Sequence, residues 1–232
     1  PKTYTTLADG IWAFQVKATD LAGRASNEIA RVWTIDATPP NVTLTGGPVG
    51  GSYTNDRSPT ITSASTEPTV IGGVTYTLKR NGSVYATDFS GASVSFSNLP
   101  DGDYQYTTNW RDEAGNYDPT PPVLNWTIDG TAPIVTIPTK PPTRTNSSTA
   151  NFGFAANEAT NGFYACQLIK DFVVISNEIC GSTKTYTGLT QGNFAIVVWA
   201  YDLAGNTSAN AGYNWAVDTT APTVSISSGP GN

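Results

Sequence analysis

The sequence contains no histidine and no methionine among its 232 residues. Without histidine, a Ser-His-Asp or Cys-His catalytic site cannot form, and histidine-based metal centres are excluded. Only two cysteines are present, which are too few for a cysteine-based zinc site and lack the Cys-x-x-Cys spacing of redox pairs. The carboxylates fall on predicted turns rather than around a cleft. These absences indicate a protein that is not an enzyme.

Charge is also scarce, because only 13% of the residues are charged and the formal net charge is −6. No basic run is present, so nucleic acid and anionic membrane surfaces are excluded as partners. No stretch of 18 apolar residues occurs, so we expect no membrane insertion. The chain begins with Pro1 rather than methionine. We therefore expect a processed form or a part of a longer chain.

What the sequence does contain is a repeated phrase, Asp-x-Ala-Gly followed by Asn or Arg. Its first aspartate stands at Asp20, Asp112 and Asp202. A second aspartate, followed by Thr-Pro or Thr-Ala-Pro within a few residues, stands at Asp36, Asp129 and Asp218. Both sets recur with a period of about 90 residues, which is the signature of a tandem array.

Each repeated phrase is flanked by segments that alternate with a period of two. Before the third copy, the alternating set is Phe194, Ile196, Val198 and Ala200. After each copy, a tryptophan is followed two residues later by Ile or Val, as at Trp126. A period of two predicts half-buried β-strands that turn this set toward a core. The repeated phrase is then the loop of a hairpin longer than the tightest type.

About seven short strands fit into each repeat, and abundant Ser, Thr, Gly and Pro favour strands and turns. This pattern predicts an all-β fold of tandem immunoglobulin-like, fibronectin III-like β-sandwiches. The expected divisions are residues 1–37, the C-terminal half of a unit; 38–130, a unit without cysteine; 131–219, a unit with both cysteines; and 220–232, the first strand of a following unit. Either the chain is a window onto a longer array, or another copy completes the half unit in a head-to-tail filament.

A Leu-x-x-Gly-x-aromatic phrase precedes each hairpin and places Trp12, Tyr104 and Phe194 at equivalent positions. It is similar to the corner between the fifth and sixth strands of such sandwiches, where a tyrosine hydroxyl bonds to the backbone. Only Tyr104 has that hydroxyl. We expect Trp12 and Phe194 to fill the same space without making the bond.

The chain resembles the bacterial Ig-like repeats of long extracellular surface proteins and adhesins. The resemblance is carried by residues 202–206 with 214–226, by 109–116 with 125–137, and extends over essentially the whole chain. It implies the sandwich fold and an extracellular or cell-surface location. For function it is less specific, because such repeats serve as spacers, adhesive modules and enzyme appendages.

Cys166 and Cys180 fall on adjacent strands of one predicted hairpin. The third unit is similar to the cysteine-bearing variety of these repeats, and that resemblance implies a Cys166–Cys180 disulfide in an oxidising compartment. Closing this short loop contributes about 3 kcal/mol in the chain-entropy model. The alternative is a pair of buried free thiols.

The recurring aspartates have two interpretations. An aspartate that opens a tight turn accepts backbone N–H bonds and holds that turn. The alternative is Ca²⁺, which needs six to eight oxygen ligands and is bound by some members of this family. Candidate ligands are Asp36, Asp112, Asp129, Asp202 and Asp218. Asp129 and Asp218 stand at the predicted unit junctions and are the better candidates. Loop acids could add further ligands there: Asp56, Glu67, Asp101, Asp103 and Glu158. No other cofactor is expected.

Val197, Trp199 and Tyr201 alternate with the core-facing set, so they are predicted to point outward. The other units carry mostly polar residues at the equivalent positions. An exposed Trp and Tyr suit sugar stacking or a lateral protein contact. The alternative is that the protein's own side chains or a neighbouring unit cover them.

We therefore expect a structural, non-enzymatic segment of a long secreted surface or fibre protein, acting as a spacer, a stalk or a filament building block. Its partners are neighbouring repeats of the same or another copy of the chain. One alternative is an adhesive or carbohydrate-binding module that contacts glycans or cell-surface proteins through Trp199 and Tyr201. Another is an accessory region of a secreted polysaccharide-degrading enzyme.

Overall fold

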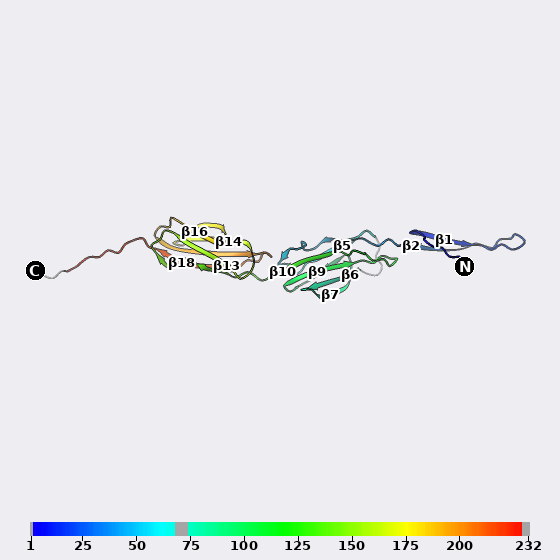
Figure 1. Ribbon diagram of the computed structural model, residues 1–232, viewed down its shortest axis with the longest axis horizontal. Helices are drawn as coiled ribbons and strands as arrows, with labels where there is room; N and C mark the ends of the chain where they lie inside the picture. The colour runs from blue at the N-terminus through cyan, green and yellow to red at the C-terminus, as the bar shows by residue number, and fades with distance from the viewer. Residues whose placement is uncertain (1, 68–73, 229–232) are drawn as a thin grey trace. The chain divides into compact units, whose positions relative to one another are not determined.

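The fold is seen in a computed structural model that describes residues 2–67 and 74–228 (Figure 1). Within these residues every regular element is a β-strand, so the predicted all-β class is confirmed. By compactness the chain divides into two units, residues 1–52 with 57–127 and residues 53–56 with 128–232. Among the described residues, no helix exists that could cross a membrane.

The first sandwich consists of a three-stranded and a five-stranded sheet. The three-stranded sheet has the order β3 (Val42–Gly46), β5 (Thr60–Ser65), β8 (Ser93–Ser95). The five-stranded sheet has the order β4 (Tyr53–Thr54), β10 (Val123–Ile128), β9 (Gly102–Asn109), β6 (Val74–Arg80), β7 (Ser83–Ser90). Alternating burial along β9 turns Tyr104, Tyr106 and Thr108 toward the core.

The second sandwich repeats this arrangement strand for strand. Its three-stranded sheet has the order β11 (Val135–Thr139), β13 (Ala150–Ala156), β16 (Thr183–Tyr186). Its five-stranded sheet has the order β12 (Arg144–Thr145), β18 (Ala211–Val217), β17 (Gly192–Asp202), β14 (Thr160–Lys170), β15 (Val173–Cys180). The predicted core-facing residues of β17 are all buried: Phe194, Ile196, Val198 and Ala200.

The same aromatic stack lies in the core of both sandwiches. In the first, Tyr104 stacks on Trp126 with ring centroids 5.3 Å apart. In the second, Phe194 stacks on Trp215, also at 5.3 Å. Both tryptophans are almost fully buried. The repeated Trp therefore anchors the last strand of each sandwich to the strand that precedes it.

The hydrogen bonds of the corner residues agree with the sequence-based expectation for Tyr104 and Phe194 and differ from it for Trp12. The Tyr104 hydroxyl donates to the Pro100 carbonyl at 2.6 Å, as a tyrosine corner requires. The expectation that Trp12 makes no such bond is wrong, because its indole N–H donates to the Ala8 carbonyl at 2.9 Å. Both acceptors lie four residues upstream of the aromatic residue. An indole N–H therefore replaces the phenol at this corner.

The N-terminal hairpin, β1 (Gly10–Val16) with β2 (Ile29–Ile35), has the register of the last two strands of a sandwich. Its predicted core face is open, because Phe14 and Val16 are exposed and Trp12 and Trp33 are only partly buried. In the second sandwich, Trp215 is covered by Phe152 of the opposing sheet. Among the described residues no such sheet covers the hairpin.

Residues 220–228 form no strand, and Val224 and Ile226 are exposed. The equivalent segments β3 and β11 are strands that pair with β5 and β13. A first strand thus needs a second strand to pair with, and the assignment of 220–232 to a following unit stays a prediction.

Candidate functional site

The aspartate that opens each repeated phrase holds its own turn. Asp112 Oδ1 accepts N–H bonds from Gly115 and Asn116 at 2.7 and 2.8 Å, and its Oδ2 accepts one from the Asn116 side chain at 2.8 Å. Asp202 accepts the same pair from Asn206, at 2.8 and 2.7 Å. Asp20 accepts N–H bonds from Ala22 and Arg24, both at 2.9 Å. Fixing the loop is thus the primary role of this carboxylate.

These bonds also set the charge of the turn in the first sandwich. Burial alone raises the pKa of the Asp112 carboxyl, but the N–H donors of Asn116 and Gly115 outweigh it, and the pKa lies below its usual value. The carboxylate therefore stays ionised although the residue is buried.

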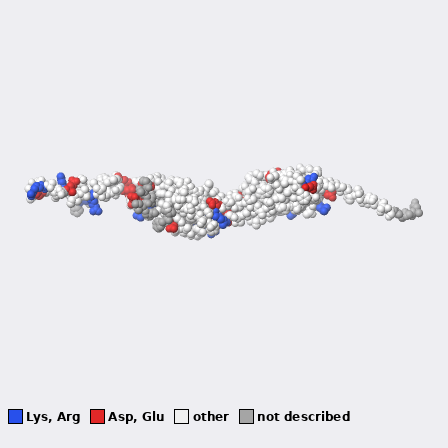
Figure 2. All heavy atoms as spheres, turned by 180° about the vertical axis from the view of Figure 1, so that it is seen from behind, with Lys and Arg blue, Asp and Glu red and all other residues white. Residues whose placement is uncertain are grey.

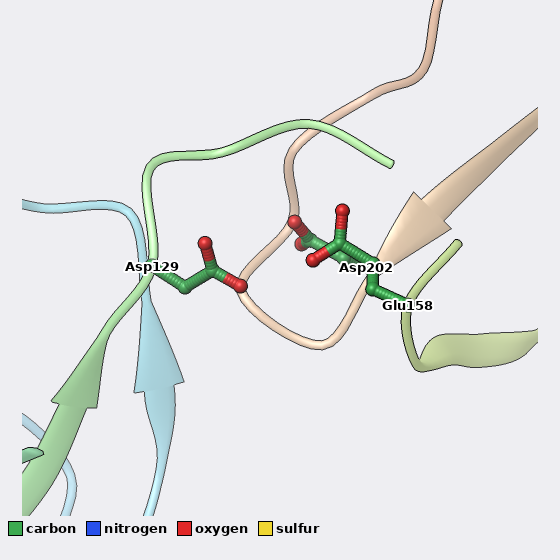
Figure 3. Close-up of side chains that lie close together, drawn as sticks. All are labelled: Asp129, Glu158 and Asp202. Carbon is green, nitrogen blue, oxygen red and sulfur yellow. The ribbon is translucent and has the colours of Figure 1, made fainter. Parts of the chain in front are cut away.

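In the second compact unit, three carboxylates meet at one point. Asp129 directly follows β10, Asp202 ends β17, and Glu158 lies in the loop between β13 and β14. One ligand oxygen from each lies within 4.8 Å of the others. Figure 3 shows the three carboxylates facing one another. This group is the strongest candidate for a metal centre in the described chain.

Glu158 is the member of this group that the protein itself leaves unsatisfied. Its Oε1 is buried and accepts no hydrogen bond from the described residues. Burial, and then the charges of Asp129 and Asp202, raise the pKa of the Glu158 carboxyl. An unpartnered carboxylate among like charges is unfavourable unless it gains a proton or a cation.

The donor set fits a hard cation such as Ca²⁺, because all three donors are carboxylate oxygens. Further oxygens lie close by, since the Asn206 side-chain N–H₂ donates to the backbone carbonyls of Asp129 and Thr131 at 2.8 and 3.3 Å. The same N–H₂ group donates to Asp202 Oδ2 at 2.7 Å, so Asn206 links the turn of Asp202 to the backbone at Asp129. Bound in a bidentate manner, these carboxylates together with water would supply the six to eight ligands that Ca²⁺ needs.

The sequence named Asp129 and Asp202 as candidate ligands, but Glu158 only as one of several loop acids that could add to the junction aspartates. The strand register shows that Glu158 is the equivalent of Glu67 in the first sandwich. Val42 pairs with Ser65 and Val135 pairs with Ala156, and each glutamate stands two residues after the second member of its pair. A repeat-by-repeat comparison of acidic residues near the second strand is the signal that finds it.

The remaining aspartates do not join such a group in the described residues. Asp36 and Asp218 each accept the N–H of the threonine two residues on, at 3.1 Å, as Asp129 does at 3.0 Å. The equivalent trio of the first sandwich, Asp36, Glu67 and Asp112, does not converge to the spacing seen in the second.

The disulfide implied by the resemblance is present. Cys166 on β14 is bonded to Cys180 on β15, with Cα atoms 6.1 Å apart, and both residues are buried. The bond is on the core side of the sheet and ties the edge strand β15 to β14. No other cysteine exists in the sequence.

The predicted outward aromatic residues lie on β17. Tyr201 is 41% exposed, while Val197 and Trp199 are partly buried. The indole N–H of Trp199 donates to the Tyr201 hydroxyl at 3.4 Å, so the two rings are neighbours. They face away from the core, as the alternation of burial along β17 shows.

Residues 43–130 match the family described as the bacterial Ig-like domain. Among curated proteins, the chain is 29% identical over 227 residues to exoglucanase B of Cellulomonas fimi. This match takes in 89% of the present chain and spans 20% of the relative's length. The suspected family is therefore confirmed in the first sandwich.

Solved structures to which this chain is similar include fibronectin type III modules. The fibronectin(III)-like modules of Clostridium thermocellum CbhA are 17% identical, with a TM-score of 0.40, 76% of this chain covered and 94% of that one. The chicken CNTN1 FN1-FN3 domains are 15% identical, with a TM-score of 0.36, covering 89% of this chain and 75% of theirs.

Proposed function

We propose that this chain, whose residues 43–130 are a bacterial Ig-like domain, is a non-catalytic spacer segment of a secreted protein that acts on polysaccharides. The observation that carries the proposal is the match to an exoglucanase. The match takes in 89% of this chain but only 20% of that enzyme, so most of the enzyme lies outside it.

The described residues also fit a non-catalytic role. The sequence has no histidine, and the recurring aspartates hold turns or, at Asp129 and Asp202, lie beside Glu158 in the carboxylate group. The two hollows in equivalent places of the sandwiches are open depressions on sheet faces, lined in part by the aromatic stacks. Catalysis in such a protein would belong to a part beyond this segment.

The spacer role is supported by how each sandwich begins. Pro40 and Pro133 precede the first strands β3 and β11 and are both buried. A proline fixes its own φ and keeps the preceding residue extended. Because the prolines are packed into their own sandwiches, only a few residues of each linker are left to bend.

We also propose that the Asp129–Glu158–Asp202 group binds Ca²⁺ and stabilises the second compact unit. Three converging carboxylates and the unpartnered Glu158 Oε1 support this. Ca²⁺ would offset the repulsion among the three charges and satisfy the buried oxygen.

The spacer proposal is tested in the longer protein that carries this segment. Residues 38–219 are replaced by a flexible Gly-Ser linker with the same number of residues, and hydrolysis of soluble and insoluble polysaccharide is measured. We expect unchanged turnover of the soluble substrate and reduced turnover of the insoluble one. Hydrolase activity in the isolated chain would contradict the proposal.

A filament of copies joined end to end is an alternative that the sequence left open. It predicts end-to-end polymers of the isolated chain in electron microscopy, formed when another copy completes the open hairpin. Discrete particles support the spacer instead.

A further inference from the structure

The outer face of the five-stranded sheet differs in chemistry between the two sandwiches. On the second sandwich, the outward cross-strand pairs of β14 and β17 are Ala165–Trp199, Gln167–Val197 and Ile169–Ala195. At the same register on the first sandwich, β6 and β9 carry Thr75–Asn109, Thr77–Thr107 and Lys79–Gln105. The second face has thus replaced polar residues with apolar and aromatic ones.

This apolar surface extends beyond the three pairs. Ile179 of β15 stands beside Ala165 in the ladder and is 75% exposed, and Phe163 at the start of β14 is 58% exposed. The outward-facing residues that pair between β14 and β15 or between β14 and β17 include no Lys, Arg, Asp or Glu. On the face in view in Figure 2, few charged side chains lie over the body of the second sandwich.

At one end of this face, a phenylalanine is held in an unfavourable conformation. The turn between β6 and β7 is Asn81-Gly82, with φ of 50° and 80°, as a tight hairpin requires. The turn between β14 and β15 places Phe172 at the glycine position with φ of 70°. This region is unfavourable for a bulky side chain, because the Cβ atom lies too close to the following carbonyl oxygen. Phe172 is also fully exposed, so packing does not explain it.

Phe172 stands at the rim of a hollow of about 300 Å³. Ile169 and Ala195 line it from the sheet, Asn193 and Asn214 add side-chain amides, and Asp171 adds a carboxylate at the turn. The equivalent hollow of the first sandwich is lined by Lys79, Gly82, Asp103 and Gln105 instead. An apolar floor, an exposed ring and amide groups therefore occur together only on the second of these two hollows.

We propose that the outer face of the second sandwich, from Phe172 to Trp199, binds a neutral polysaccharide chain. Sugar rings present C–H faces that pack on aromatic rings, and their hydroxyl groups bond with amides. Ala195 and Trp199 are four residues apart on β17, or about 13 Å, which accommodates several sugar rings. The absence of charge among the outward paired residues of the three strands favours an uncharged chain.

The footprint argues against a protein as the occupant. Three strands about 4.8 Å apart, and about 20 Å long from Ile169 to Phe163, give a surface on the order of 300 Å². Stable protein interfaces bury about 800 Å² on each partner. The choice of polysaccharide as the ligand class rests on the proposed function. The apolar surface itself does not depend on a spacer role.

Affinity gel electrophoresis of the whole chain tests the proposal. Gels contain neutral polymers (hydroxyethyl cellulose, xylan, galactomannan or soluble starch) or the anionic carboxymethyl cellulose. We expect at least one neutral polymer to retard the chain. If hydroxyethyl cellulose does so, carboxymethyl cellulose should retard the chain at least tenfold less. Trp199→Ala should weaken the binding at least tenfold, while Tyr117→Ala, an exposed tyrosine of the first sandwich, should leave it unchanged.

Phe172→Gly is the decisive variant, because it restores the residue that the turn favours. We expect a higher melting temperature together with at least fivefold weaker polysaccharide binding, a combination that damage to the fold cannot produce. Absence of binding to every neutral polymer overturns the inference but leaves the spacer function standing. Concentration-dependent dimers in ultracentrifugation that Trp199→Ala abolishes would instead assign the face to a second copy and also overturn it.

Discussion

The two sandwiches have the same frame and different surfaces. Strand order, the aspartate-held loop and the buried tryptophan stack recur at equivalent positions. The second sandwich alone has a disulfide, and among the described residues it alone has a converging carboxylate trio and an apolar outer face. Repetition of the core thus leaves surface positions free to change, because the core needs only the alternate residues of each strand.

The largest expected effect breaks the shared frame. Trp126→Ala and Trp215→Ala should each lower the free energy of unfolding of their own sandwich by about 3–5 kcal/mol, since each removes a buried aromatic side chain. Denaturant melts followed by fluorescence give both values. Trp33→Ala, in the open hairpin, is the control and should cost far less, and an equal cost there would mean that the hairpin is covered in solution.

The disulfide should make a stability contribution that only the second sandwich has. Cys166→Ala with Cys180→Ala should destabilise the second sandwich by about 3 kcal/mol, because the unfolded chain regains the freedom of a closed loop. Differential scanning calorimetry should show one transition moving down while that of the first sandwich stays. Equal movement of both transitions would show that the units unfold together.

Calcium should act on the second unit alone. At a concentration 100 times its dissociation constant, it should stabilise that unit by about 2.7 kcal/mol. Glu158→Gln should abolish this gain, whereas Glu67→Gln at the equivalent position of the first sandwich should retain it. The melting temperatures with calcium chloride and with chelator give the answer, and identical values in the wild type would remove the metal proposal.

The smallest expected effect is the change of unfolding free energy with pH, which has opposite signs in the two units. Glu158 has a raised pKa in the fold, so stability present below about pH 4.5 is lost as the pH rises through the folded pKa. Asp112 has a lowered pKa, so its contribution is present above about pH 3.8 and is lost as the pH falls further. With chelator present, acidification from pH 7 to 4.5 should raise the transition of the second unit relative to the first, and Glu158→Gln should cancel that rise.

The frame could be predicted from sequence because it depends on local periodicity. Phe194, Ile196 and Val198 alternate with a period of two, and the Asp-x-Ala-Gly phrase carries its own turn chemistry. The corner bond of Trp12 was missed because a hydroxyl was taken to be necessary, although an indole N–H at the same place also reaches the carbonyl.

The sites could be predicted only in part, because they depend on pairing between distant strands. Asp129 and Asp202 are visible as repeated acids, but Glu158 joins them only once β13 is set in register with β11. Trp199 and Tyr201 were visible by alternation. The role of Phe172 could not be predicted, because it depends on a positive φ angle that a turn sequence without glycine does not indicate.

Hydrogen exchange of the whole chain, measured by mass spectrometry with and without calcium chloride, tests the central claim that the second sandwich carries a site on a frame that the first one shares. We predict slower exchange in peptides containing Asp129, Glu158 and Asp202 to Asn206. Peptides containing Asp36, Glu67 and Asp112 should not change. Equal protection of both sets, or of neither, would contradict the account.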